Sequence, residues 1–174
     1  MAQDRGTAPP KSPPNVEQRW ANLADLILIV AREIQFRGYG NKRALSLSQS
    51  EGMVMRHLAA QASATPTQIA AATGLQRTNV STVLRDLEKK GLIERQVCEG
   101  DRRGVSVRRT KRGASNYALV RREWGAAVSA AANTDTTNLD AALSLLKSIE
   151  TGLILTRPRV TGGPEQGSAE HQDT

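Results

Sequence analysis

Hydrophobic residues recur every three or four positions along most of this chain, a spacing that places them on one face of an α-helix. The first such stripe consists of Val16, Trp20, Leu23, Ile27, Val30 and Ile34. Gly38 and Gly40 follow it, so we expect the helix to end near them. An apolar stripe of this length needs another surface to pack against.

Two capping motifs mark the next helix starts. Ser48-Gln49-Ser50-Glu51 follows Leu47, and in such a box the serine oxygen accepts one N–H while the glutamate reaches back to the cap. Thr65-Pro66-Thr67-Gln68 repeats the pattern, with proline at the first helical position, and Gly74 ends this short helix. The apolar residues of the two helices are Val54, Met55 and Leu58, then Ile69, Ala70 and Ala71.

A helix from about Arg77 to Lys90 is expected next, because Val80, Val83, Leu84 and Leu87 fall at i, i+3, i+4 and i+7. Gly91 stands where a left-handed residue closes a helix. The opposite face of this helix is polar.

Two short strands, Leu92–Val97 and Val105–Arg108, are predicted to form a hairpin through the glycine-containing turn Cys98–Gly104. Two further helices follow, separated by the polar break Asn133–Asn138. Their apolar residues are Tyr117, Val120, Trp124 and Val128, then Leu139, Leu143, Leu146, Ile149 and Leu153.

The spacing of four small or apolar residues predicts a helix-turn-helix. Ala70, Gly74, Val80 and Val83 stand at relative positions 0, +4, +10 and +13. The alanine lets two helices approach, the glycine allows the turn, and the valines seat the second helix on the first. With the hairpin behind it, this gives a mainly α fold with a small β wing, in the α+β class.

Charge points to a partner for this unit. Residues 77–112 hold 11 Lys/Arg and 5 Asp/Glu, a net +6 out of the chain's +7. A basic segment with short polar side chains on one helix face is what a reader of double-stranded DNA needs. A solvated amphipathic helix is the plainer alternative.

The candidate DNA contacts lie on the polar face of the 77–90 helix and at two helix starts. Arg77 and Asn79 can make paired hydrogen bonds to purine edges, and the hydroxyls can reach bases or phosphates. Free backbone N–H groups at helix starts could also hold a phosphate. The full set on these helices is Thr65, Thr67, Gln76, Arg77, Thr78, Asn79, Ser81, Thr82 and Arg85.

Three charged residues at the hairpin turn complete the candidate site. We expect Arg103 to enter a narrow minor groove, Asp101 to orient its guanidinium, and Arg102 to contact phosphate. The alternative is a surface salt bridge that only stiffens the turn.

These residues together resemble the MarR family of winged-helix transcription factors. The matching pieces are Leu47-Ser48 with Met55 and Leu58, Thr65 to Leu75, Leu84 to Arg95, Asp101-Arg102-Arg103, and Thr110 with Gly113. The resemblance implies a homodimer on a pseudo-palindromic operator, commonly a repressor released by a small aromatic ligand and often controlling its own gene. Two departures are Gln76, where a better helix cap is usual, and Arg109, which replaces an apolar residue.

On this reading the chain divides into five parts. We expect a disordered arm over residues 1–15 and a disordered acidic tail over 158–174, since the arm is proline-rich and the end of the tail has no Lys/Arg. Residues 41–110 form the winged helix-turn-helix lobe. Residues 16–40 and 111–157 form helices outside that lobe, whose apolar faces would be exposed in a monomer and therefore predict dimerisation.

The regulatory signal is less defined. Five aromatic residues (Trp20, Phe36, Tyr39, Tyr117, Trp124) could line a ligand cleft, though core packing is the commoner role for such residues. Cys98 could sense oxidants, or it could be an inert small side chain; as the only cysteine it forms no intrachain disulfide. His57 and His171 are far apart in the sequence, so we expect no metal site, and no cofactor is implied.

Other classes fit less well. The sequence shows no phosphate-binding loop, no set of nucleophile and base residues and no paired carboxylates, so we do not expect an enzyme. A winged helix can serve as a protein-interaction module, but the concentrated positive charge favours DNA. RNA binding lacks an aromatic platform. The apolar stretch Leu23–Ala31 is too short to cross a bilayer, so no membrane association is expected and the protein should be cytoplasmic.

Overall fold

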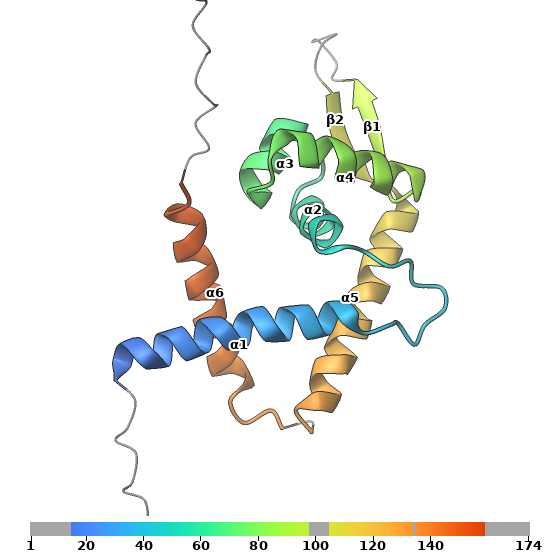
Figure 1. Ribbon diagram of the computed structural model, residues 1–174. Coiled ribbons are helices and arrows are strands. Elements are labelled where there is room, and N and C mark those ends of the chain that lie inside the picture. The colour runs from blue at the N-terminus through green and yellow to red at the C-terminus, as the bar shows by residue number, and fades with distance from the viewer. Residues whose placement is uncertain (1–14, 98–104, 134, 159–174) are drawn as a thin grey trace, which may run out of the picture. The chain divides into compact units, whose positions relative to one another are not determined.

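The computed structural model describes residues 15–97, 105–133 and 135–158. Contacts divide the chain into two units, residues 1–134 and residues 135–174. In order, the elements are α1 (Val16–Phe36), α2 (Gln49–Ala60), α3 (Pro66–Thr73), α4 (Arg77–Lys89), β1 (Ile93–Val97), β2 (Val105–Arg109), α5 (Lys111–Ala131) and α6 (Leu139–Leu155) (Figure 1). The predicted fold class, mainly α with a small β-hairpin, is confirmed. The expected disorder of the two chain ends concerns residues that lie almost entirely outside the described ranges.

Both predicted capping boxes are present. Ser48 Oγ accepts from the Glu51 N–H at 3.2 Å, and Glu51 Oε2 accepts from the Ser48 N–H at 2.8 Å. Thr65 and Gln68 make the same exchange at 3.2 and 2.8 Å, with Pro66 in the first turn of α3. These reciprocal bonds satisfy N–H groups that a helix start leaves without a partner, so they fix where α2 and α3 begin.

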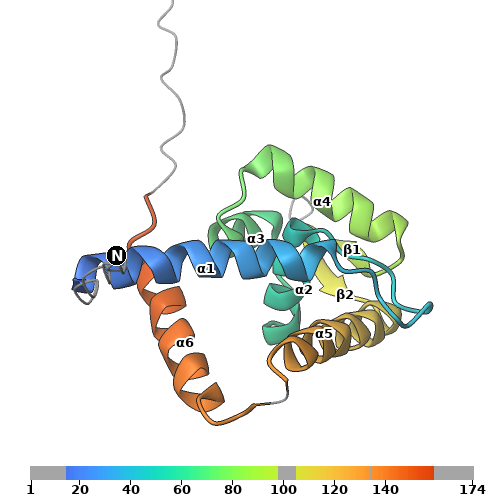
Figure 2. The ribbon, with the colours of Figure 1, turned by 60° about the horizontal axis from the view of Figure 1, so that its bottom comes forward.

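One apolar core lies among α2, α3, α4, the hairpin and α5. Its fully buried large side chains are Val54, Met55, Leu58, Ile69, Val80, Leu84, Leu87, Leu92, Ile93, Val107 and Val120. Figure 1 and Figure 2 both show α3 and α4 side by side over α2, with α5 leaving the base of the hairpin. The predicted stripe of α4 therefore faces this core, as do Ile69 and, in part, Ala70 of α3, whereas Ala71 is exposed.

The helix after the wing is more deeply involved than expected. We predicted it to lie outside the compact lobe, but Tyr117 and Val120 of α5 belong to the core cluster. The expectation is wrong for the N-terminal half of α5 because this helix starts directly at the end of β2. Gly113 packs so tightly there that a Cβ atom would stand 1.9 Å from the Leu92 oxygen.

The hairpin is antiparallel, with Ile93 opposite Arg109 and Val97 opposite Val105. Its second strand also pairs with the segment before α3: the Val107 N–H donates to the Ala64 oxygen at 2.9 Å, and the Ala64 N–H donates back at 3.0 Å. The wing is therefore attached to the helix-turn-helix by backbone hydrogen bonds as well as by the core.

The outer helices are apolar but have no buried residues. On α1 the exposed large apolar residues are Val16, Trp20, Leu26, Leu28, Ile29, Val30 and Phe36. On α6, considered by itself, they are Leu139, Leu143, Leu145, Leu146, Leu153, Ile154 and Leu155. Within the described ranges, neither these nor the other helices are long and apolar enough to cross a membrane.

Candidate nucleic-acid interface

The turn between α3 and α4 is built as the sequence predicts. Gly74 adopts a left-handed conformation (φ 72°), which costs glycine little, and its N–H donates to the Ala70 oxygen at 2.8 Å. The buried Thr73 hydroxyl donates to the Ile69 oxygen at 2.7 Å. These contacts close α3 and direct the chain into α4.

The two faces of α4 are sharply different. Val80, Val83, Leu84 and Leu87 are buried against the core. Every candidate residue at its start and on its outer face is exposed: Gln76, Arg77, Thr78, Asn79, Ser81, Thr82 and Arg85. The structure thus brings seven of the predicted contacts together on one solvent-facing surface, which we call the α4 outer face.

Hydrogen bonds along the α4 outer face orient some of these groups. Ser81 Oγ donates to the Arg77 oxygen at 3.1 Å, and Thr82 Oγ1 donates to the Thr78 oxygen at 3.4 Å. Arg85 Nη2 in turn donates to Thr82 Oγ1 at 3.4 Å. With their protons directed into the helix, the two hydroxyls present lone pairs outward, where they can accept hydrogen bonds from base amino groups.

The starts of α3 and α4 differ in what they offer. Thr65 is half-buried, and its hydroxyl is occupied by the capping box, accepting from the Gln68 N–H and donating to Gln68 Oε1 at 3.1 Å. Gln76, by contrast, makes no side-chain cap hydrogen bond among the described residues. Thr67 is exposed beside Thr65. The first-turn N–H groups of α4 are therefore the ones most open to a phosphate.

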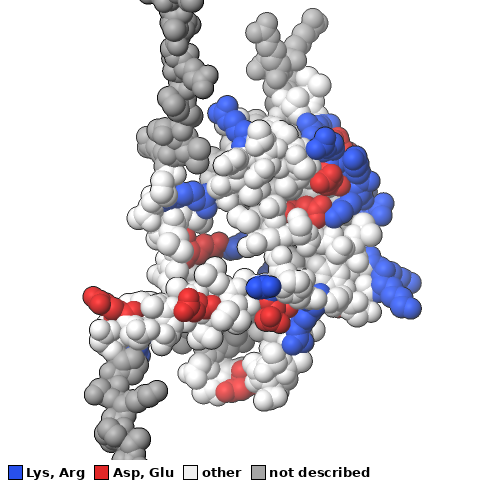
Figure 3. Space-filling view, viewed as in Figure 1, with Lys and Arg blue, Asp and Glu red and all other residues white. Residues whose placement is uncertain are grey.

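Some of the basic residues counted in the sequence form ion pairs with acidic residues of the same chain. Arg95 Nε lies 3.1 Å from Glu88 Oε2, and Arg108 Nε lies 2.5 Å from Glu94 Oε1. Lys90 is paired with Glu51. On the face in Figure 3, basic side chains gather along one edge with acidic ones among them. The net charge of the segment stands, but fewer of its cations are free to meet phosphates than the count suggests.

The wing tip falls outside the described residues. Asp101, Arg102 and Arg103, together with Cys98, lie between the ends of β1 and β2 in the range 98–104. Their predicted roles stay predictions.

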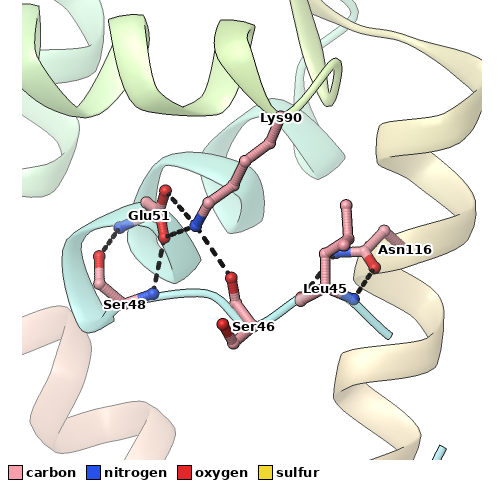
Figure 4. Close-up of polar contacts among 6 residues, drawn as sticks. All are labelled: Leu45, Ser46, Ser48, Glu51, Lys90 and Asn116. Atoms are coloured by element: carbon pink, nitrogen blue, oxygen red, sulfur yellow. Dashed lines mark hydrogen bonds and ion pairs between the residues drawn. The ribbon is translucent and has the colours of Figure 1, made fainter. Parts of the chain in front are cut away.

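Sequence reasoning missed two polar contacts beneath the interface, both shown in Figure 4. Lys90 Nζ donates to both carboxylate oxygens of Glu51 and to the Ser46 oxygen, and the buried Asn116 bonds both the N–H and the oxygen of Leu45. Glu51 was recognised only as a helix cap. The partners are far apart in the sequence, so no local signal pointed to them.

The aromatic residues separate into two groups. Tyr117 is buried, and Tyr39 and Trp124 pack partly buried against the core, while Trp20 and Phe36 are exposed. Burial raises the pKa of the Tyr117 hydroxyl above its usual value, partly offset by neighbouring arginine side chains of which Arg121 has the largest effect. Among the described residues no group of His, Cys, Asp or Glu could hold a metal ion.

A sequence model of the MarR family matches residues 45–104, the stretch that runs from the start of α2 through the helix-turn-helix to the wing. Over these residues the chain is similar to the MarR family. The match includes α2, α3, α4 and β1 but ends before β2, and it confirms the resemblance seen in the motifs of this segment. Among curated proteins, no sequence relative matches the chain.

Solved structures extend the likeness of fold beyond the matched segment. BldR, a transcriptional regulator from Sulfolobus solfataricus, superposes with a TM-score of 0.62 at 18% identity, covering 80% of this chain and 99% of its own. A mutant MarR from E. coli complexed with operator DNA gives 0.57 at 21%, covering 78% and 99%. FabT from Streptococcus pneumoniae, in complex with DNA, gives 0.56 at 25%, covering 79% and 94%. The chain therefore shares its fold with these proteins.

Proposed function

We propose that this protein is a sequence-specific regulator of transcription that binds double-stranded DNA as a homodimer. The observation that carries the proposal is the α4 outer face, a row of exposed Arg, Thr, Asn and Ser side chains held rigidly by a buried apolar stripe. A helix of this kind fits the major groove, where such side chains discriminate base edges.

Each candidate residue has a proposed part in this interface. Arg77 and Asn79 read purine edges, and Thr78, Ser81, Thr82 and Arg85 contact bases or phosphates. Thr67 and the first-turn N–H groups after Gln76 hold phosphates; Thr65 acts mainly by capping α3 beside them. For the wing we keep the assignment of Arg103 to the minor groove, Asp101 to its orientation and Arg102 to phosphate.

The homodimer is proposed on the apolar surfaces of α1 and α6, each of which lacks buried residues in a single chain. Exposed apolar surface on this scale is uncommon for a soluble monomer and is relieved when two copies pack together. A symmetric dimer would place two α4 outer faces on the two halves of a pseudo-palindromic operator.

The direction of control is proposed from the family resemblance alone. We propose a repressor that acts on its own gene and is released by a small aromatic ligand, with Tyr39 and Trp124, partly exposed beside the core, as candidate contacts. A DNA-binding regulator of this kind would work in the cytoplasm and would need no catalytic activity.

A direct test uses a labelled duplex from immediately upstream of the protein's own gene. We expect a shifted band and a footprint with two half-sites one helical turn apart, whereas a scrambled duplex should bind more weakly. The logarithm of the affinity should fall steeply with the logarithm of the salt concentration, because binding releases counterions from the phosphates. A flat salt response and equal binding to both duplexes would instead support a protein-interaction module.

A further inference from the structure

We infer that Lys90 is a positioning residue for DNA recognition: through buried Glu51, it fixes the C-terminal end of the recognition helix to the segment that connects α1 and α2. The inference rests on the proposed function, because it assigns Lys90 a part in aiming α4 at its operator. It does not require Lys90 to touch DNA.

The contacts of Lys90 are short and directed inward. Its Nζ donates to Glu51 Oε1 at 2.7 Å, to Glu51 Oε2 at 2.8 Å and to the Ser46 oxygen at 3.0 Å (Figure 4). An ammonium group has three protons, so these three bonds use all of its donors. The side chain that ends the basic α4 helix is therefore fully engaged within the protein.

Glu51 is the buried member of the pair. Its side chain is 6% exposed, against 34% for that of Lys90. It already accepts from the Ser48 N–H in the capping box of α2. A carboxylate at this depth is costly unless it is compensated, and within the described part of the chain Lys90 is the cation that compensates it.

The segment joined by Lys90 is also tied to α5. One residue before Ser46, the Leu45 N–H donates to Asn116 Oδ1 at 2.7 Å, and Asn116 Nδ2 donates to the Leu45 oxygen at 3.1 Å. Further back, the Gly40 N–H donates to Glu123 Oε2 at 2.7 Å. The segment after α1 is thus hydrogen-bonded both to α5 and to the end of α4. It therefore links α1 to α4, the recognition helix.

A matched control lies on α4, two residues before Lys90. Glu88 pairs with Arg95, but both side chains are largely solvent-accessible, at 44% and 39%. Solvated pairs of this kind contribute little. Glu88→Gln and Glu51→Gln each remove one negative charge. A difference in DNA binding between the two variants therefore reflects positioning and not overall charge.

The experiment compares wild type, Lys90→Met, Glu51→Gln and Glu88→Gln on the best duplex that the wild type selects from a random-sequence library. Glutamine at position 51 retains an oxygen for the Ser48 cap. We expect Lys90→Met and Glu51→Gln each to lose about 2- to 30-fold in affinity for the selected duplex relative to a scrambled one. Glu88→Gln should keep this ratio.

The sign of the Glu51→Gln effect is decisive. Removing a negative charge from a DNA-binding protein strengthens binding if only the net charge matters. Weaker specific binding by this more positive variant therefore supports positioning; equal or tighter binding overturns it. Reduced stability alone would lower the active fraction of protein without changing the ratio between the two duplexes.

Lys90→Met tests the inference independently. If Lys90 contacts a phosphate directly, its loss lowers the salt slope by about 1 per site, whereas a positioning residue leaves the slope unchanged. Amide hydrogen exchange without DNA supplies the final readout: residues 45–48 and 88–92 should exchange faster in this variant. Unchanged exchange overturns the inference and leaves the proposed function in place, whereas a wild type that prefers no duplex overturns the proposed function and, with it, the role of Lys90 in recognition.

Discussion

Among the described glycines, Gly113 leaves the least room for a Cβ atom, at the point where α5 leaves the wing. A Cβ atom there would meet the Leu92 oxygen at 1.9 Å, far inside van der Waals contact. We expect Gly113→Ala to lower the free energy of unfolding by about 1–3 kcal/mol, because the backbone of one partner must shift. Urea denaturation followed by circular dichroism measures the change.

Gly125 provides the control on the same helix, since nothing lies within 4 Å of its Cβ position. Gly125→Ala should instead raise the free energy of unfolding by about 0.5–1 kcal/mol, the usual gain of alanine in a helix. Equal stability of the two variants would show that the contact at Gly113 is looser than described.

Asn79 offers the most specific prediction on the α4 outer face. Its exposed amide suits adenine, to which asparagine makes two hydrogen bonds. Asn79→Ala should weaken operator binding by about 1–3 kcal/mol and relax the preference at one base-pair position. A binding assay against a panel of single-position operator variants measures both effects. Ser115→Ala, exposed on α5, is the control and should bind like wild type.

At the scale of elements, local signals in the sequence predicted the starts of α2 and α3 and the ends of α3 and α4. Ser48 and Thr65 cap their helices through bonds to residues three positions away, and Gly74 and Gly91 adopt the positive φ that closes a helix. Such features are encoded within a few residues. The apolar stripe of α4 is equally local, and all of its predicted members are buried.

Contacts between distant elements could not be predicted in the same way. Asn116 bonds Leu45 across 71 positions and Lys90 bonds Glu51 across 39, and neither pair belongs to a repeating pattern. For the same reason, the net charge of residues 77–112 could be counted from the sequence, but the ion pairs that its basic residues form within the protein could not be predicted. The engagement of α5 in the core depends on the close approach at Gly113, which becomes apparent only in three dimensions.

The uncapped start of α4 leads to a prediction in which stability and function change in opposite directions. Gln76 makes no side-chain cap bond, and serine at this position could accept an N–H of the first turn. Gln76→Ser should therefore stabilise the protein by about 0.5–1 kcal/mol. If those N–H groups hold a phosphate, the new cap competes with it and operator affinity should fall.

Thermal unfolding and DNA titration of the same preparation measure the two quantities. A rise in both stability and affinity would show that the start of α4 does not serve as a phosphate site.

At the scale of the whole molecule, the exposed apolar surface of α1 predicts assembly. Leu28 is 69% exposed in a single chain. If it lies in the dimer interface, Leu28→Asp buries an unpaired charge and should shift sedimentation from dimer to monomer at micromolar concentration. Operator affinity should fall with it, because two linked half-sites bind far more tightly than one.

Gln35→Glu adds one negative charge at an exposed polar position of the same helix and controls for charge. It should sediment as a dimer. Monomeric wild type under these conditions would contradict the proposed homodimer.

The backbone pairing of Ala64 with Val107 has a mechanical consequence for such a dimer. Because β2 is hydrogen-bonded to Ala64, two residues before α3, we expect the hairpin and the helix-turn-helix to move as one rigid unit. We therefore expect that a ligand that releases DNA leaves the shape of this unit unchanged. Such a ligand would instead change the distance or the rotation between the two units of the dimer, so that they no longer match successive turns of the duplex.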